Sequence, residues 1–158
     1  MAGRVTAIEP QKRDPNRFNV FVDGEFALGL AVDLAIELKV GMQLSDNRIA
    51  ELQVADEVAR AKERALDYLS HRQRSKAELR QYLTRRDFSE SVANEVIDRL
   101  ERTGLVDDVE FARFWVENRT KFRPRGRRML RYELYQKGIA DEIIEGALDG
   151  YDEADAIE

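Results

Sequence analysis

Hydrophobic positions change their spacing at about residue 32. Before that point, short apolar stretches at 5–8, 18–22 and 26–30 are separated by polar connectors, and Asp23-Gly24 joins the last two. An Asp-Gly pair between two such stretches is typical of a two-residue β-hairpin. The pattern therefore predicts a small antiparallel β meander. Three short strands bury little surface by themselves, so we expect this meander to pack on a neighbouring helix.

From about residue 32 the spacing becomes helical. A first helix is predicted over 31–38, with Gly41 closing its end. Ser45 can cap a second helix that runs from 46 into the fifties. A third and longer helix is predicted over 55–71, because Val58, Ala61 and Ala65 fall on one face of it.

Two further helices follow, with clear start and stop signals. Ser75 and Glu78 have the spacing of a capping box, and Ser89 can cap the next helix. Thr103-Gly104 predicts where that helix ends. Together with the end of the preceding long helix, these segments predict a unit of three short helices.

The same pattern of apolar positions then occurs a second time. When Ala65 is aligned with Ala112, and four extra residues are allowed in the second copy, apolar positions coincide through Ile97 and Leu148. The second copy predicts helices over 110–119, 125–136 and 141–148, with Gly138 closing the middle one. A repeat that keeps its packing but little identity is typical of repeat proteins.

The predicted fold class is mainly α, with tandem three-helix repeats in an elongated array preceded by a small N-terminal antiparallel β meander. The predicted organisation is a meander with a short helix (1–44), a linking helix with the first repeat (45–104), the second repeat (105–150), and an acidic tail or the start of a truncated third repeat (151–158). Such an array exposes a long surface and offers no obvious catalytic pocket, so binding is the expected activity.

Charge is distributed unevenly along the chain. The net charge is −5, but residues 111–138 carry nine basic and two acidic side chains, whereas residues 139–158 carry eight acidic side chains and no basic one. A basic middle between acidic ends indicates an anionic partner that the mean value conceals. The sequence has no cysteine, which suits a reducing cytoplasm, and no apolar run near the length of a membrane span.

The strongest candidate for a contact surface is the basic segment around the insertion in the second copy. Guanidinium groups there could bind carboxylates of a protein partner or phosphates. A solvated basic face is the ordinary alternative, but acidic residues are nearly absent from this segment. The candidate binding residues are Arg119, Lys121, Arg123, Arg125, Arg127, Arg128 and Arg131.

The first copy has a basic counterpart, for which acidic neighbours make internal pairing equally reasonable. Its secondary candidates are Arg72, Arg74, Lys76 and Arg80. Arg72 and Arg119 occupy matching positions, which suggests one salt bridge used twice. Trp115 matches Tyr68 and lies four residues after Phe111, a spacing that favours core packing over stacking on bases.

Nothing in the sequence points to an enzyme. His71 has no partner that would make it catalytic or metal-binding, and the acidic cluster of Asp107, Asp108 and Glu110 fits the first turn of a helix. No phosphate-binding loop, dinucleotide fingerprint or nucleophile elbow is present. We therefore expect no cofactor and no metal.

Several segments, taken in order, resemble the RecX family, the bacterial regulators of the RecA recombinase. The segment Arg72-Gln-Arg-Ser-Lys-Ala-Glu-Leu79 is similar to the R-x-R-S-x-x-E-L signature of the family's first repeat, and Gly104-Leu-Val-Asp-Asp108 resembles its link into the second. The resemblance implies a non-enzymatic protein that binds in the groove of the RecA filament on DNA and modulates its activity, usually by inhibition. Members usually have at least three repeats, and this sequence shows two.

Two other functions stay open from the sequence alone. One is a stand-alone nucleic-acid-binding helical module, because short helices joined by turns and rich in arginine are common in DNA-binding proteins. The other is a scaffold for a different protein partner, since fold and charge do not name a partner. The expected partner is the RecA filament, with DNA bound weakly or indirectly, no membrane, and a monomeric, cytoplasmic chain.

Overall fold

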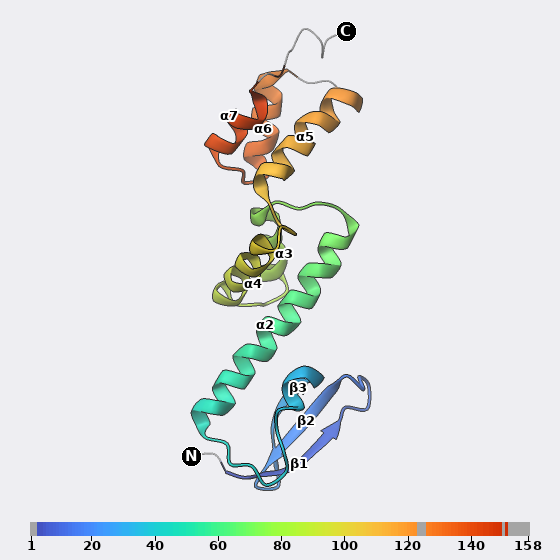
Figure 1. Ribbon diagram of the computed structural model, residues 1–158, viewed down its shortest axis with the longest axis vertical. Coiled ribbons are helices and arrows are strands. Elements are labelled where there is room, and N and C mark those ends of the chain that lie inside the picture. The colour runs from blue at the N-terminus through green and yellow to red at the C-terminus, as the bar shows by residue number, and fades with distance from the viewer. Residues whose placement is uncertain (1–2, 123–125, 150, 152–158) are drawn as a thin grey trace. The chain divides into compact units, whose positions relative to one another are not determined.

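The computed structural model describes residues 3–122, 126–149 and 151. The chain divides into two compact units, which meet between residues 63 and 64 within one long helix. The first unit contains the strands, a four-residue helix and the first part of the long helix, and the second unit contains the rest of the long helix and the helices that follow it (Figure 1).

The first unit contains a three-stranded antiparallel sheet in the order β1-β2-β3, made of Val5–Pro10, Arg17–Val22 and Glu25–Ala31. The turn between β2 and β3 is formed by Asp23 and Gly24, whose φ angles of 51° and 84° are both positive. Positive φ at both central residues gives a turn whose twist matches that of the two strands. The predicted hairpin and meander are confirmed.

One face of the sheet forms a small hydrophobic core with the segment that follows it. The buried residues are Val5, Val20, Leu28, Leu30, Ala35, Leu38, Leu44 and Leu52. The predicted helix over 31–38 is wrong in length, because α1 covers only Val32–Ala35. After α1 the chain turns through hydrogen bonds from Leu38 N to Ala35 O and from Met42 N to Lys39 O. Leu38 and Leu44, which lie within and after these turns, are both buried in the core.

The long helix α2 spans Asp46–His71 without a break. The prediction of two separate helices over this stretch is wrong. No glycine or proline lies between 46 and 71, so nothing interrupts the backbone hydrogen bonds there. As predicted, Ser45 begins the helix, and its Oγ accepts a hydrogen bond from Arg48 N at 3.1 Å.

The first repeat consists of the end of α2, α3 (Lys76–Arg85) and α4 (Glu90–Arg102). Ser75 and Glu78 form the predicted capping box at the start of α3, and Ser89 caps α4 through Val92 N. The apolar faces of α3 and α4 pack on each other and bury Leu79, Leu83, Val92, Ala93, Val96, Ile97 and Leu100.

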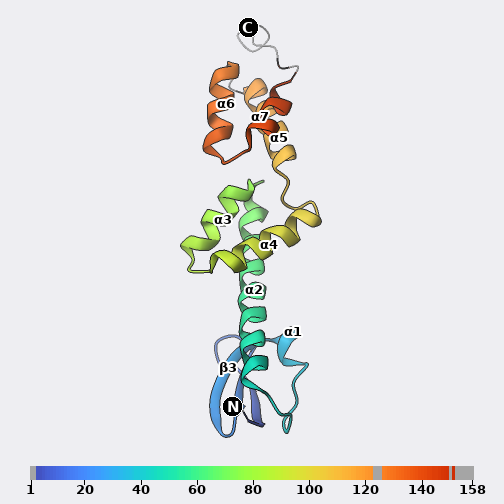
Figure 2. The same ribbon diagram turned by 90° about the vertical axis from the view of Figure 1, so that its left-hand side faces the viewer.

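The second repeat consists of α5 (Asp108–Phe122), α6 (Arg127–Gln136) and α7 (Asp141–Leu148), which pack together as Figure 2 shows. Its core contains Phe111, Ala112, Val116, Leu130, Leu134, Ile139, Ile144 and Leu148. The turn after α6 passes through Gly138, whose φ is 76°. A mainly α protein with tandem three-helix repeats and an N-terminal antiparallel sheet is therefore confirmed.

Candidate functional site

The basic segment of the second repeat runs from the end of α5 to the first two turns of α6. The side chains of Lys121, Arg123 and Arg125 lie outside the described residues. The four other predicted binding residues, Arg119, Arg127, Arg128 and Arg131, are described. They differ in whether their charge is already engaged within the chain.

Arg119 is held against the aromatic cluster of the second repeat. Its guanidinium carbon lies 4.7 Å from the ring centroid of Trp115, and its Nε lies 3.6 Å from a carboxylate oxygen of Glu133. Trp115 donates a hydrogen bond from Nε1 to the same carboxylate at 3.2 Å, and its ring stacks on buried Phe111. The expected packing role of Trp115 is confirmed. Glu133 therefore supplies a counter-ion to Arg119, while Lys137 Nζ also lies 5.4 Å from the ring centroid of Trp115.

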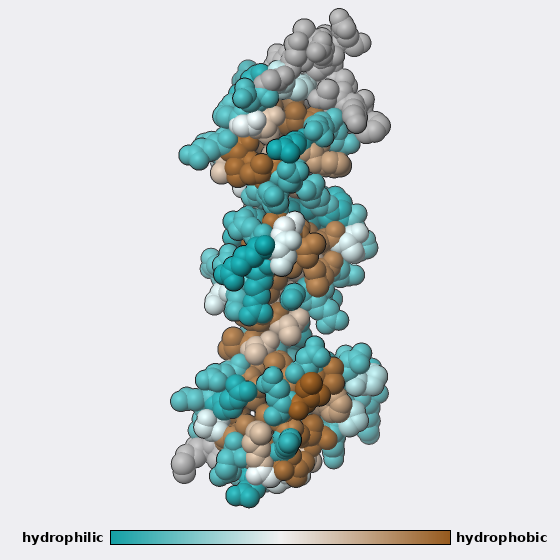
Figure 3. Space-filling model, in the orientation of Figure 1, coloured by the Kyte–Doolittle hydropathy of each residue, from teal (hydrophilic) through white to brown (hydrophobic). Residues whose placement is uncertain are grey.

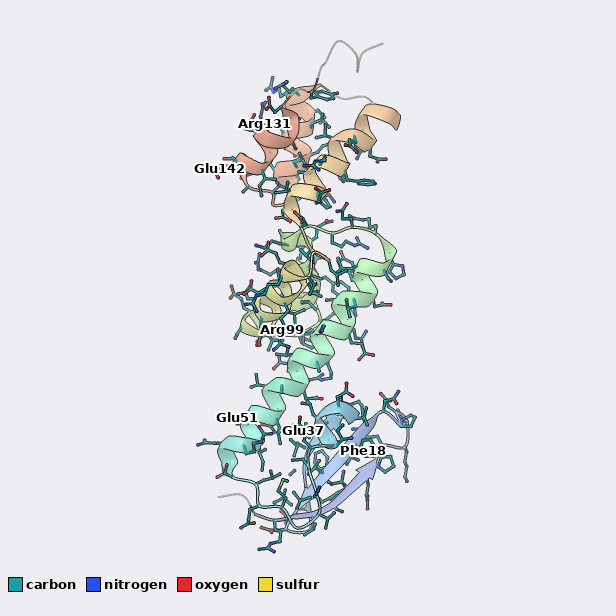
Figure 4. All side chains as sticks on the ribbon, viewed as in Figure 1. Phe18, Glu37, Glu51, Arg99, Arg131 and Glu142 are labelled. Atoms are coloured by element: carbon teal, nitrogen blue, oxygen red, sulfur yellow. The ribbon has the colours of Figure 1, made fainter. Side chains whose placement is uncertain are left out.

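Arg127 and Arg131 are also engaged within the second repeat. Arg127 donates a hydrogen bond to the carbonyl oxygen of Tyr151 at 2.8 Å. Arg131, labelled in Figure 4, forms a two-pronged ion pair with Glu145 of α7, with distances of 2.6 and 3.2 Å. This contact lowers the pKa of the Glu145 carboxyl below its ordinary value. Both arginines thus help to join α6 to the residues that follow it.

Arg128 differs from these three. Its side chain is exposed, and it forms no hydrogen bond or ion pair with any residue that the structure describes. Three neighbouring large side chains on α6, Met129, Tyr132 and Tyr135, are 48%, 59% and 66% exposed. On the face seen in Figure 3, hydrophilic residues cover most of each repeat and hydrophobic residues show in separate areas between them. Exposed tyrosines beside an arginine are typical of protein-binding surfaces. These three side chains were not among the contact residues predicted from the sequence. They lie outside the apolar stripe of Leu130 and Leu134, and positions outside such a stripe are normally exposed.

Most of the basic candidates in the first repeat are engaged within the chain. Arg72 pairs with Glu78 at 2.7 Å, and Lys76 pairs with Glu101 at 3.2 Å. Arg80 donates a hydrogen bond from Nε to Asn94 Oδ1 at 3.1 Å. Arg72 and Arg119 each form an ion pair, as their matching positions suggested, but their partners Glu78 and Glu133 do not occupy matching positions.

Glu78 connects the two repeats electrostatically. Besides Arg72 it contacts Lys137 Nζ of the second repeat at 3.3 Å, and it accepts a hydrogen bond from Ser75 N. Burial raises the pKa of this carboxyl. The hydrogen bonds from Arg72 and the Ser75 amide and the charges of Arg72 and Lys137 lower it, and their combined effect is larger than that of burial. The net pKa lies below the ordinary value, so the fold favours the ionised form of Glu78.

Arg74 belongs to a stacked group of four side chains in the first repeat. Its guanidinium carbon lies 3.8 Å from the ring centroid of Tyr68, and Tyr68 stacks on Tyr82 at 3.9 Å with an angle of 12° between the rings. Arg86 lies over Tyr82 at 4.4 Å. We call Arg74, Tyr68, Tyr82 and Arg86 the first-repeat stack. Sequence reasoning missed it, because three different segments contribute its members.

Backbone contacts also join the two repeats. Ser75 Oγ donates a hydrogen bond to the carbonyl oxygen of Lys137 at 2.7 Å, and Asp108 accepts one from Lys76 N at 2.9 Å. A Cβ placed on Gly138 would lie 2.3 Å from Ala77 Cβ, so the turn after α6 sits directly on the first turn of α3. The first turn of α3 and the turn after α6 therefore pack closely against each other. We call this contact between the repeats the joint.

The described residues show neither a metal site nor a membrane-spanning helix. They contain no group of three or more histidine, cysteine, aspartate or glutamate side chains that could hold a metal ion. No helix in the described ranges is long and apolar enough to cross a membrane. What they do present is arginine and tyrosine on the outer faces of two helical repeats.

Comparison with known proteins decides the family. Three family models match in succession: the RecX N-terminal domain at residues 3–45, the first RecX three-helix domain at 61–100, and the second at 107–148. A crystal structure of regulatory protein RecX is 30% identical and superposes with a TM-score of 0.78, covering 99% of this chain and 77% of that one. The chain belongs to the RecX family.

RecX relatives extend beyond the length of this chain. Regulatory protein RecX of Bacillus subtilis (strain 168) is 39% identical over 149 residues, which cover 93% of this chain and 56% of that protein. RecX of Staphylococcus aureus (strain JH9) is 34% identical over 144 residues, 90% of this chain and 53% of that protein. The crystal structure of RecX from Lactobacillus salivarius is 29% identical, with a TM-score of 0.62 over 65% of this chain and 67% of that one. The chain thus spans little more than half the length of these curated RecX proteins.

Proposed function

We propose that this RecX chain regulates the RecA recombinase, most directly as an inhibitor, by binding the RecA–DNA filament through the second repeat. The observation that carries the proposal is the combination of RecX family membership with a basic, tyrosine-bearing face on α6. Arg128 contributes a charge that no described residue neutralises, and Tyr132 and Tyr135 contribute exposed aromatic surface.

The distribution of charge supports a protein partner with bound DNA over DNA alone. The chain carries a net charge of −5, and residues 139–158 are entirely without basic side chains. A polyanion such as free DNA is repelled by these regions, whereas a protein surface can present single carboxylates to α6. Arginine and tyrosine are also the residues most enriched where protein interfaces are strongest.

The direct test measures RecA-dependent ATP hydrolysis and strand exchange on single-stranded DNA with the cognate recombinase. Adding the chain at up to the RecA concentration should slow both reactions. Unchanged rates in both assays would contradict the proposal. Parallel binding to the same DNA without RecA separates it from a stand-alone nucleic-acid-binding module, which would bind equally well without the recombinase.

Matched variants locate the contact. Arg128→Gln removes the exposed charge on α6, whereas Arg113→Gln removes an exposed charge on α5 that pairs with Glu110 at 3.0 Å. Inhibition should weaken about tenfold for Arg128→Gln, as for an interface residue that contributes strongly, and change less than about twofold for Arg113→Gln. Equal effects of the two substitutions would argue against a contact through α6.

A further inference from the structure

The first-repeat stack leaves two guanidinium groups without an acidic partner. No carboxylate among the described residues lies within ion-pair distance of Arg74 or Arg86, although Arg72 and Lys76 nearby are both ion-paired. The buried Nε of Arg74 has no hydrogen-bond acceptor among the described residues. A positive group that is partly buried and not neutralised is costly unless something outside it supplies the charge.

The second repeat shows how the same position is neutralised. Trp115 corresponds to Tyr68, and Glu133 corresponds to Tyr82 when the two repeats are aligned with the four-residue insertion. In the second repeat, Glu133 accepts the indole hydrogen bond and pairs with Arg119. In the first repeat, an uncharged tyrosine ring takes this place. The first-repeat stack therefore holds two guanidinium groups and no carboxylate, whereas Arg119 in the second repeat is paired with Glu133.

The geometry of the stack restricts what it can bind. Tyr68 contacts Tyr82 and lies under Arg74, and Tyr82 contacts Tyr68 and lies under Arg86. Because the rings already stack on each other and on guanidinium groups, a base could stack there only by displacing one of them. Nε of Arg74 is buried, but the terminal guanidinium nitrogens of Arg74 and Arg86 form no hydrogen bond or ion pair with any described residue. They match the two oxygens of a carboxylate.

We propose that the first-repeat stack is a second contact surface, which binds acidic side chains of the protein partner through the guanidinium groups of Arg74 and Arg86. The inference rests on the proposed function and adds the chemistry of a second contact. Stacking on the tyrosines holds both guanidinium groups in place before binding, so less side-chain entropy is lost on association. The two repeats would then bind the partner together, one through α6 and the other through this stack.

The test compares arginine variants within the first repeat by measuring the dissociation constant of the labelled chain on preformed RecA–DNA filaments. Arg86→Gln removes an exposed member of the stack, and binding should weaken about tenfold. Arg74→Gln should do the same. Arg99→Gln removes an exposed arginine of α4, labelled in Figure 4, that pairs with Glu95, and it should change binding less than about twofold. Urea midpoints confirm that each variant is folded.

Three other results would overturn the inference. If the wild-type chain binds filaments and neither Arg86→Gln nor Arg74→Gln weakens that binding, the inference is wrong but the proposed function stands. If the two variants bind single-stranded DNA more weakly than the wild type in the absence of RecA, and the salt dependence of that binding falls by the amount expected for about one phosphate contact, the stack binds nucleic acid and not carboxylates. Absence of wild-type binding to filaments would overturn both the inference and the proposed function.

Discussion

Ser75 Oγ donates a hydrogen bond to the carbonyl oxygen of Lys137, 62 residues further along the chain, at a distance of 2.7 Å. The same oxygen accepts the hydrogen bond from Glu78 N that caps α3. One buried hydroxyl therefore both begins a helix in the first repeat and holds the turn after α6 in the second. The joint between the repeats depends on it.

Ser75→Ala should destabilise the helical unit by about 2 kcal/mol, because it removes a helix cap and leaves a carbonyl in the joint without its partner. Ser89→Ala removes a cap from α4 at an exposed position and should cost about 1 kcal/mol. Urea unfolding followed by circular dichroism measures both. Equal losses would mean that the hydrogen bond to Lys137 contributes nothing.

Gly138→Ala should cost more stability than Gly104→Ala or Gly146→Ala. The new methyl group would overlap Ala77, and φ at this position is 76°. Gly104→Ala, with φ of 80° and open space around the new methyl, isolates the backbone strain, for which we expect about 1 kcal/mol. Gly146→Ala, inside α7 with no atom near the new methyl, should stabilise by about 0.5 kcal/mol. A cost at Gly138 no larger than at Gly104 would contradict the close contact with Ala77.

Acid should weaken the joint through Glu78. The pKa of this carboxyl is lower in the folded chain than its ordinary value of 4.5, so its stabilising contribution is complete above that value and disappears as the pH falls through the folded pKa. Glu78→Gln should remove this part of the acid sensitivity when melting temperature is measured between pH 3 and pH 7. An identical pH profile in the variant would show that Glu78 is not the group responsible.

Asp108 should act in the opposite direction. Burial raises the pKa of its carboxyl, and the nearby acids Glu101 and Asp107 raise it further, while its contacts with Lys76 lower it only partly. A raised carboxyl pKa makes the folded state bind protons more readily, so this group favours folding as the pH falls. Asp108→Asn should therefore steepen the loss of stability in acid. A shallower loss would contradict the assignment.

In the first unit, Asp56 should be the most sensitive polar residue. Its buried carboxylate accepts hydrogen bonds from both terminal nitrogens of Arg17 at 3.2 and 2.9 Å, from Ala31 N at 2.9 Å and from Arg60 at 3.2 Å. Asp56→Ala leaves a partly buried arginine without its counter-ion, which typically costs about 3–5 kcal/mol. Glu51→Gln, at an exposed pair with Arg48, should cost less than about 0.5 kcal/mol and serves as the control in urea unfolding.

Local signals in the sequence predicted most of the fold. The Asp23-Gly24 turn, the Ser75–Glu78 capping box and the Ser89 cap involve residues within a few positions of one another, and all three are confirmed. The repeat itself followed from apolar spacing. The length of α1 could not be predicted in the same way, because it depends on where Leu38 and Leu44 enter a core built with the sheet.

Long-range partners explain why the state of each arginine could not be predicted. Arg119 is near Glu133 only because α5 packs on α6, and Arg74 stacks on Tyr68 only because the chain folds back at the end of α2. Sequence identified the basic residues as a group. The three-dimensional contacts divide them into those that are paired within the chain, such as Arg72 and Arg131, and those that face outward, such as Arg128.

The most direct test of the central proposal is co-sedimentation with preformed RecA filaments on single-stranded DNA. The chain should pellet with the filaments and stay in the supernatant with the same DNA in the absence of RecA. A chain that stays in the supernatant in the presence of intact filaments would contradict binding to the RecA–DNA filament.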